Sequence, residues 1–174
     1  MSHFSGNDRE FWRCKVAKYL VALSVFCSTQ VRSADIESLW VSKSHRQLHV
    51  YIAGEVVRII PIKLGIEPEG PKRWRGDKRT PEGIYRISAK NRFSRFHLSL
   101  RIDYPNQKDK VFAERYDLDS GSDIYLHGLP NNMLLDEAFY QSEDWTEGCI
   151  AMSDDDIQYL FKHVDINTPI VIVP

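Results

Sequence analysis

Short segments in which apolar and polar residues alternate make up most of the chain from Leu39 onward. Such alternation over four to eight residues is typical of β-strands with one buried face. Residues 47–52 show this pattern, a further apolar segment follows at 56–62, and Ala53-Gly54 between them predicts a hairpin turn. Further strands are expected at residues 84–87, 97–102, 124–126 and 169–173. The chain is therefore predicted to be mainly β.

One segment has the features of a helix. Ser153 is a good N-cap, acidic residues fill the first turn, and the apolar residues at 157, 160 and 161 share one face. Residues 65–81 are rich in glycine, proline and charge, which predicts a long loop. Because no repeat or second boundary interrupts the chain, we expect one domain that is mainly β with short helices.

The first 34 residues differ from the rest of the chain. Basic residues precede an apolar stretch at 19–27, and small or polar residues follow it. This order predicts a secretory signal peptide at residues 1–33, with cleavage after Ser33. The stretch is too short to span a bilayer comfortably, and Phe26 makes Cys27 a poor site for a lipid anchor. An amphipathic first helix of a cytosolic domain is the alternative.

Charge and composition argue against some partners. The 174-residue chain has a formal net charge of -1, so neither nucleic acid nor an anionic membrane is an expected partner. Residues 1–34 hold five basic and two acidic side chains, and their removal leaves 18 basic and 22 acidic ones, a net charge of -4. We therefore expect an acidic exported domain, located in the periplasm or outside the cell.

Cys149 is the one cysteine that remains once the N-terminal segment is removed, because Cys14 and Cys27 leave with it. A single thiol in an exported chain has no intrachain disulfide partner, so it is either an inert buried group or a reactive one. Gly148 before it favours a reactive thiol, since a glycine lets backbone N–H groups approach a reacting carbonyl.

His127 is the best candidate for the base that a nucleophilic cysteine requires. It ends an apolar strand next to Gly128, where a side chain can leave the core for a cleft. A hydrogen-bonded core histidine is the alternative. No close-spaced pair of ligands accompanies Cys149 and His127 to support a zinc site.

The segment at residues 76–85 is denser in special residues than a plain loop requires. Pro81 and Gly83 fix a turn, and Arg79 offers a planar fork for a carboxylate. A structural turn with solvated charges is the alternative. The residues that we expect to contact a substrate are Arg79, Tyr104, Asn106 and Thr146.

Together these segments resemble the L,D-transpeptidase catalytic domain family of the YkuD type. That family has a histidine, often followed by glycine, upstream of a Ser/Thr-x-Gly-Cys motif. His127-Gly128 and Thr146-Glu147-Gly148-Cys149 fill these places. Residues 76–85 are similar to the family's Gly-Asp-x-x-Thr-Pro-x-Gly segment, and residues 168–172 to the end of its domain. The resemblance covers about residues 39–174 and implies a β-sandwich-like catalytic domain.

The resemblance also implies a role for each matching residue. Cys149 would be the nucleophile, His127 the general base and acid, and the Gly128 carbonyl the group that orients the imidazole. Backbone N–H groups of Gly148 and Cys149 would form the oxyanion hole. The implied donor is a peptidoglycan tetrapeptide stem, cleaved before its terminal D-alanine. The acyl group would pass to a diaminopimelate amine, a protein lysine or water, and no metal or organic cofactor is implied.

Departures from the family pattern bear on the acceptor. Many members have His just before the Gly-Cys pair, where this chain has Glu147, and Arg or Asn soon after it, where this chain has Ala151 and Met152. Three interpretations stay open: a transpeptidase, a hydrolase (an L,D-carboxypeptidase or an amidase releasing wall-linked protein), and a non-catalytic wall-binding module. The presence of both nucleophile and base argues against the last of them.

Overall fold

The computed structural model describes residues 35–174, and the predicted signal peptide lies outside the described residues. The strands are β1 (Ser38–Ser42), β2 (Gln47–Ile52), β3 (Glu55–Pro61), β4 (Gly83–Asn91), β5 (Ser99–Ile102), β6 (Tyr125–His127), β7 (Ile150–Ala151) and β8 (Pro169–Val173). The helices are α1 (Gln107–Arg115), α2 (Glu137–Ser142) and α3 (Asp154–His163). The prediction of a mainly β fold with short helices is confirmed.

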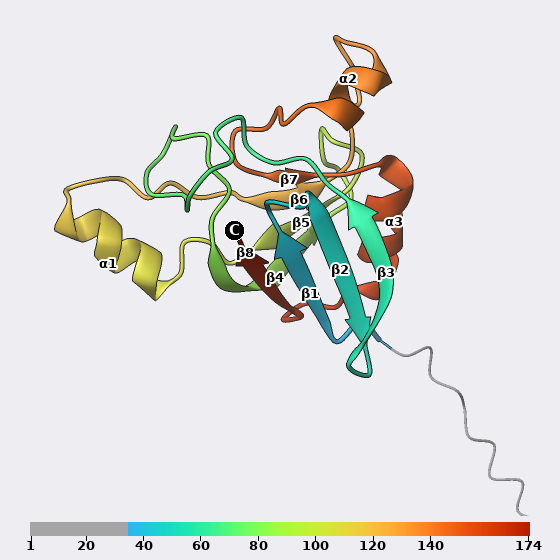
Figure 1. Ribbon diagram of the computed structural model, residues 1–174, viewed down its shortest axis with the longest axis horizontal. Helices are drawn as coiled ribbons and strands as arrows, with labels where there is room; N and C mark the ends of the chain where they lie inside the picture. The colour runs from blue at the N-terminus through green and yellow to red at the C-terminus, as the bar shows by residue number, and fades with distance from the viewer. Residues whose placement is uncertain (1–34) are drawn as a thin grey trace, which may run out of the picture. The chain divides into compact units, whose positions relative to one another are not determined.

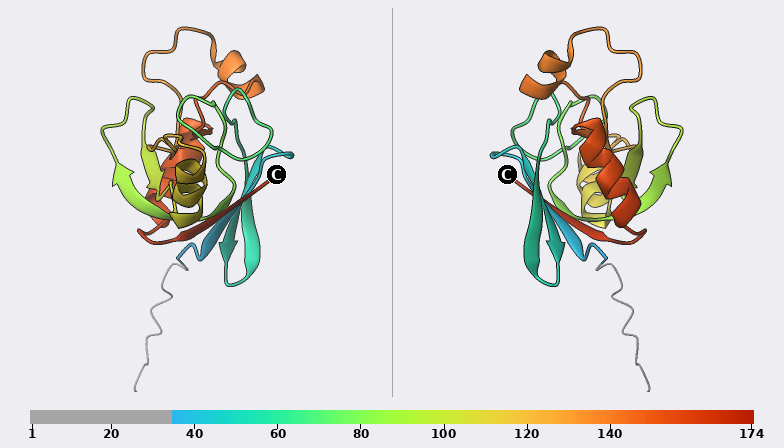
Figure 2. Two further views of the ribbon diagram at one scale, coloured as in Figure 1. Left: turned by 90° about the vertical axis from the view of Figure 1, so that its left-hand side faces the viewer. Right: turned by 90° about the vertical axis from the view of Figure 1, so that its right-hand side faces the viewer.

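All eight strands belong to one curled sheet in the order β3-β2-β1-β8-β4-β5-β6-β7. The pairs β1–β8 and β6–β7 are parallel, and the other neighbours are antiparallel. The long strand β4 pairs with β8 through residues 83–86 and with β5 through residues 87–91. The β-sandwich-like arrangement thus takes the form of a single sheet that curls around a shared core (Figures 1 and 2).

The predicted hairpin and the predicted helix are both present. Ala53 and Gly54 connect β2 to β3 with φ angles of 51° and 78°, the positive values that a tight hairpin turn requires. Ser153 caps α3 by accepting a hydrogen bond from the Asp156 N–H at 3.2 Å. Ile157 and Leu160 are fully buried on the inner side of α3, which packs against β5 and β6.

The structure contains two helices that the sequence did not predict. Asn106 starts α1 with a capping box, in which its side chain accepts hydrogen bonds from the N–H groups of Lys108 and Asp109. Asp136 caps α2 in a similar way. Ala113 in α1 and Tyr140 in α2 are the buried residues of these helices. With so little apolar surface, neither helix has the periodicity by which α3 could be predicted.

Only part of the segment predicted to form a strand at residues 97–102 does so in the structure. The strand β5 begins at Ser99, whereas His97 lies outside it with a φ of 59°. Residues 92–98 therefore form the loop that connects β4 to β5, and His97 and Leu98 belong to this loop rather than to the strand. Within the described residues, no helix has the length and hydrophobicity needed to cross a lipid bilayer.

Candidate active site

The pairing of β6 with β7 brings His127 and Cys149 together. The register places Leu126 opposite Ile150 and His127 opposite Ala151, so Cys149, directly before β7, lies beside the start of β6, two residues from His127. Both residues line one cavity of about 230 Å³. We call it the histidine pocket, and its walls are Asn91, residues 93–96, Ser99, Tyr125, His127 and Cys149.

Cys149 also lines a second cavity of about 310 Å³ that does not include His127. We call it the charged pocket, and its walls are Lys72, Arg75, Gly76, residues 121–124, Glu147 and Cys149. Glu147 is largely exposed there, and its carboxylate lies 3.9 Å from the Lys78 ammonium. Cys149 therefore lines two cavities, and these differ in the charged side chains of their walls.

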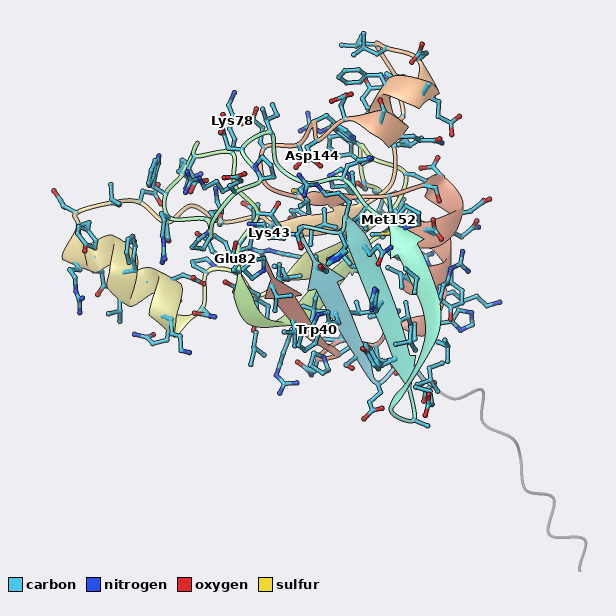
Figure 3. The ribbon with its side chains drawn as sticks, in the orientation of Figure 1. Trp40, Lys43, Lys78, Glu82, Asp144 and Met152 are labelled. Carbon is cyan, nitrogen blue, oxygen red and sulfur yellow. The ribbon has the colours of Figure 1, made fainter. Side chains whose placement is uncertain are left out.

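A larger cavity of about 440 Å³ includes neither His127 nor Cys149 and is lined by Lys43 and Glu82, among others. The Lys43 Nζ binds the Glu82 carboxylate at 2.7 Å and the carbonyl oxygens of Gly70 and Thr80 at 2.7 and 3.2 Å. Figure 3 labels Lys43 and Glu82 close together, and Glu82 directly precedes β4. Because all three ammonium protons have partners, this cluster holds the 65–81 loop against the sheet rather than offering a free reactive group.

The hydrogen bonding of His127 defines which ring nitrogen can act as a base. Its Nδ1 lies 2.8 Å from the Gly128 carbonyl oxygen. Since a carbonyl can only accept, Nδ1 carries the proton and Nε2 keeps its lone pair. The observed contact is the one that the family resemblance implied for Gly128.

Aromatic side chains enclose the same imidazole. The ring centroids of Phe96 and Trp145 lie 4.5 and 5.5 Å from that of His127, and His127 is only 3% exposed. This burial lowers the pKa of His127 to about 4, although the bond to the Gly128 carbonyl opposes the shift. The imidazole is therefore neutral at physiological pH and available as a base.

The Cys149 thiol is also neutral in the resting protein. Burial raises its pKa to about 11, against the opposing effects of the Tyr125 backbone N–H and the Lys72 ammonium. The sulfur lies 3.7 Å from the Asp123 carbonyl oxygen, a distance at which the S–H can donate a weak hydrogen bond. Because the thiol and the imidazole are both uncharged, nucleophilic attack requires proton transfer to His127 as the substrate reacts.

Alkylation of Cys149 by iodoacetamide is expected to report this raised pKa. The thiolate is the reactive form, so the rate should rise about tenfold for each pH unit between 7 and 10. An ordinary thiol would level off near pH 9. Mass spectrometry of the Cys149 peptide measures the rate separately from Cys14 and Cys27. A plateau at neutral pH would show instead that the thiolate is already formed in the resting protein.

The turn before the nucleophile is organised by Thr146. Its Oγ1 accepts a hydrogen bond from the Gly148 N–H at 3.1 Å and donates one to the Cys149 carbonyl at 2.7 Å. Gly148 has a φ of 125°, and a Cβ there would lie 2.6 Å from the Arg79 carbonyl oxygen. The Gly148 N–H, predicted to face an oxyanion, is thus already bonded. No hydrogen bond within residues 35–174 uses the Cys149 N–H.

Asp77 anchors the loop that carries the Arg79 carbonyl. Its carboxylate accepts hydrogen bonds from the N–H groups of Arg73, Trp74 and Arg79 and pairs with the Lys72 ammonium at 2.7 Å. Burial by itself raises the pKa of this carboxyl, but these bonds outweigh it and the net pKa is lowered. The Gly-Asp-x-x-Thr-Pro-x-Gly segment therefore positions Gly148 through packed backbone, a role that sequence analysis did not assign.

The four residues expected to contact a substrate have structural partners. The buried Tyr104 hydroxyl donates to the Ser120 carbonyl at 2.8 Å, Asn106 caps α1, and Thr146 bonds within its own turn. The N–H of Arg79 donates to Asp77. None of the four lines the histidine pocket or the charged pocket. Their contact with substrate stays a prediction.

Residues that sequence analysis did not single out make up most of the pocket walls. Phe96 and Arg95 come from the loop before β5, and Trp145, which lines neither pocket, packs its ring against that of His127. The position of Trp145 directly before the Thr-x-Gly-Cys motif is the sequence signal that could have indicated an aromatic neighbour of His127. Among residues 35–174, no group of three or more His, Cys, Asp or Glu side chains is arranged to hold a metal ion.

Solved structures of several bacterial proteins share this fold. The helical cell shape determining protein Pgp2 of Campylobacter jejuni is 23% identical, with a TM-score of 0.58, covering 80% of this chain and 48% of that one. Bd1075 of Bdellovibrio bacteriovorus is 24% identical, with a TM-score of 0.56 and coverages of 82% and 50%. L,D-transpeptidase 1 of Mycobacterium tuberculosis is 21% identical, with a TM-score of 0.50 and coverages of 80% and 62%.

The chain spans about half the length of the first two proteins, and at such identities the likeness shows the fold alone. No curated protein sequence matches the chain. The sequence profile of YkuD, described as the L,D-transpeptidase catalytic domain, matches residues 37–172 and thus most of the chain. The chain therefore belongs to the L,D-transpeptidase catalytic domain family.

Proposed function

We propose that this protein is an L,D-transpeptidase, a cysteine acyl-transferase that acts on peptidoglycan stem peptides during cell-wall remodelling. The observation that carries the proposal is the arrangement of its two reactive groups. His127, with Nδ1 held by the Gly128 carbonyl, keeps an unprotonated Nε2 and lines the same cavity as Cys149. Cysteine acyl transfer requires this pairing of a thiol with an oriented base.

In the first half of the reaction, His127 Nε2 takes the Cys149 thiol proton as the sulfur attacks the carbonyl carbon before the terminal D-alanine. The new S–C bond converts that carbonyl into an oxyanion. Collapse of this intermediate breaks the C–N bond, and the proton on Nε2 passes to the departing amine. The products are a thioester on Cys149 and free D-alanine.

In the second half, an acceptor amine attacks the thioester and gives a proton to His127. The C–S bond then breaks, and the sulfur recovers its proton from the imidazole. The Cys149 N–H is the oxyanion donor that the resting structure leaves open, whereas the Gly148 N–H must first leave Thr146 Oγ1. We propose diaminopimelate or a protein lysine as the source of the amine.

Hydrolysis of the same thioester is the second candidate function. The charged pocket supports it, because its two basic and two acidic side chains can hold water close to Cys149. The protein would then be an L,D-carboxypeptidase or an amidase that releases wall-linked protein. A non-catalytic wall-binding module would require neither the nucleophile Cys149 nor the base His127.

For the transpeptidase and for the hydrolase alike, we propose an exported, periplasmic location, on the basis of the N-terminal sequence.

Incubation of the purified protein with a tetrapeptide muropeptide tests these proposals together. We expect an intact-mass increase on Cys149 that corresponds to the tripeptide acyl group, followed by cross-linked products when an amine acceptor is present. Tripeptide without any cross-linked product would replace the transpeptidase with the hydrolase. The absence of both an adduct and a product would exclude both enzymes.

A further inference from the structure

The two cavities at Cys149 must hold different parts of the substrate. During acyl transfer the base passes a proton between the thiol and the amine nitrogen, so that nitrogen has to come within hydrogen-bond reach of the imidazole. His127 lines the histidine pocket and not the charged pocket. The amine component therefore occupies the histidine pocket, and the acyl component extends into the charged pocket. This assignment rests on the proposed function.

The charges of the two cavities differ in a way that bears on this assignment. The charged pocket contains two basic side chains, Lys72 and Arg75, and two acidic ones, Asp123 and Glu147. The histidine pocket contains no acidic side chain, and Arg95 is its one permanently charged residue. A ligand group that enters the histidine pocket therefore meets an uncompensated positive charge.

Arg95 is held in place by its main chain while its guanidinium stays available. The Arg95 carbonyl accepts a hydrogen bond from the Asn131 N–H at 2.9 Å. On either side, the Ser94 Oγ accepts from the Phe96 N–H at 3.0 Å, and the Asn131 side chain binds the His97 N–H at 2.8 Å. The Arg95 side chain forms no ion pair or hydrogen bond within the described part of the chain, residues 35–174. Hydrogen bonds thus fix the backbone around Arg95, while no side chain of residues 35–174 pairs with its guanidinium.

A D-amino acid has groups that complement the Arg95 guanidinium and the His127 base. In D-alanine the amine nitrogen and the carboxylate are attached to the same carbon, so a nitrogen beside His127 brings the carboxylate along within a few ångströms. The aromatic side chains of Phe93 and Phe96 offer an apolar wall for the small methyl group. We propose that Arg95 binds the α-carboxylate of the amino acid whose amine leaves, or enters, in the histidine pocket.

This binding mode determines which amines are good reaction partners. A terminal D-alanine and the D-centre of diaminopimelate both have a carboxylate next to the reacting nitrogen. The ε-amine of a protein lysine and water have none, so they would not gain the interaction with Arg95. The proposal therefore favours donors with a free terminal carboxylate and acceptors that are α-amino acids.

Two donor tetrapeptides that differ in one group test the proposal. One ends in D-alanine with a free carboxylate, and the other ends in the corresponding primary amide. If Arg95 forms a hydrogen-bonded ion pair with the terminal carboxylate, the wild-type protein should prefer the free acid over the amide by about 10- to 100-fold in kcat/KM for Cys149 acylation. Arg95→Gln should reduce that preference to about threefold or less, and Arg95→Lys should retain part of it.

Arg92→Gln is the matched control, because Arg92 lies in the same loop and carries the same charge but does not line the histidine pocket. It should keep the wild-type preference. Equal use of both donors by the wild-type protein, or an unchanged preference in Arg95→Gln, would overturn the role of Arg95 while leaving the enzyme proposal in place. Failure of both donors to acylate wild-type Cys149 would instead overturn the proposed function.

Discussion

Cys149→Ala is expected to abolish acyl transfer and to leave the fold intact. The substitution removes the atom that forms the thioester, so no covalent route remains, and turnover should fall by about 10⁴-fold or more. The residue lines two cavities, and the hydrogen bond from its sulfur to the Asp123 carbonyl is weak, so little packing is lost with the sulfur. Intact mass after incubation with the tetrapeptide, together with the thermal unfolding midpoint, measures both effects.

His127→Gln is the informative partner of this variant. It keeps the thiol but removes the base, so acylation should slow by about 10²- to 10⁴-fold rather than disappear. Its rate should also recover as the pH approaches 11, where the thiol of Cys149 ionises without help. Turnover at wild-type rates in Cys149→Ala would refute the assigned nucleophile. A pH-independent rate in His127→Gln would refute the assigned base.

Asp77→Ala is expected to destabilise the fold by about 3 kcal/mol. The side chains of Asp77 and Lys72 are only 1% and 4% exposed, and the substitution leaves the ammonium buried without its charge partner. Three backbone N–H groups lose their acceptor at the same time. Urea unfolding measures the change as a shift of the midpoint at constant slope.

Asp119→Ala is the matched control for this effect. Asp119 pairs with Arg75 at 2.7 Å, the same distance as in the buried pair, but both side chains are more than 60% exposed. Solvent screens such a pair, so the unfolding midpoint should hardly move. Equal shifts in the two variants would contradict the anchoring role of Asp77. In the double variant Lys72→Met/Asp77→Leu, part of the stability should return because no buried charge remains.

The pH dependence of this anchor has a definite sign. Because hydrogen bonds hold the pKa of Asp77 below its ordinary value near 4, the folded protein favours the ionised carboxylate. The stabilisation is therefore fully present above the ordinary pKa and is lost as the pH falls through the lowered one. His127 affects stability over a higher pH range. Its pKa falls from 6.5 in the unfolded chain to about 4 in the folded protein, so stability decreases as the pH falls from 6.5 to 4 and the unfolded chain takes up the proton.

Local patterns in the sequence were sufficient for most of the regular structure. Alternation over 47–52 predicted β2, the apolar segment at 56–62 after the Ala53-Gly54 turn predicted β3, and the apolar face behind Ser153 predicted α3. The same reasoning missed α1 and α2, which begin at good caps but bury little. A cap alone does not predict a helix when no periodic face follows it.

The candidate site divides in the same way. The identities of Cys149, His127 and the Gly148 turn could be read from the sequence, since motif spacing reflects which atoms must meet. Their protonation could not, because it depends on burial by Phe96, Trp145 and other residues distant in the chain. Nor could sequence show that the Gly148 N–H is bonded to Thr146, or that Tyr104 faces Ser120.

By itself, the sequence determined the mainly β character of the chain, its nucleophile and base candidates, and its resemblance to a family. The tertiary structure alone decided which residues surround them. The parallel pairing of β6 with β7 brings Cys149 to His127, and the loop before β5 adds Phe96 and Arg95 to the same cavity. Such neighbours follow from strand order and from contacts across the chain, and residues that are distant in sequence leave no local periodicity from which to infer them.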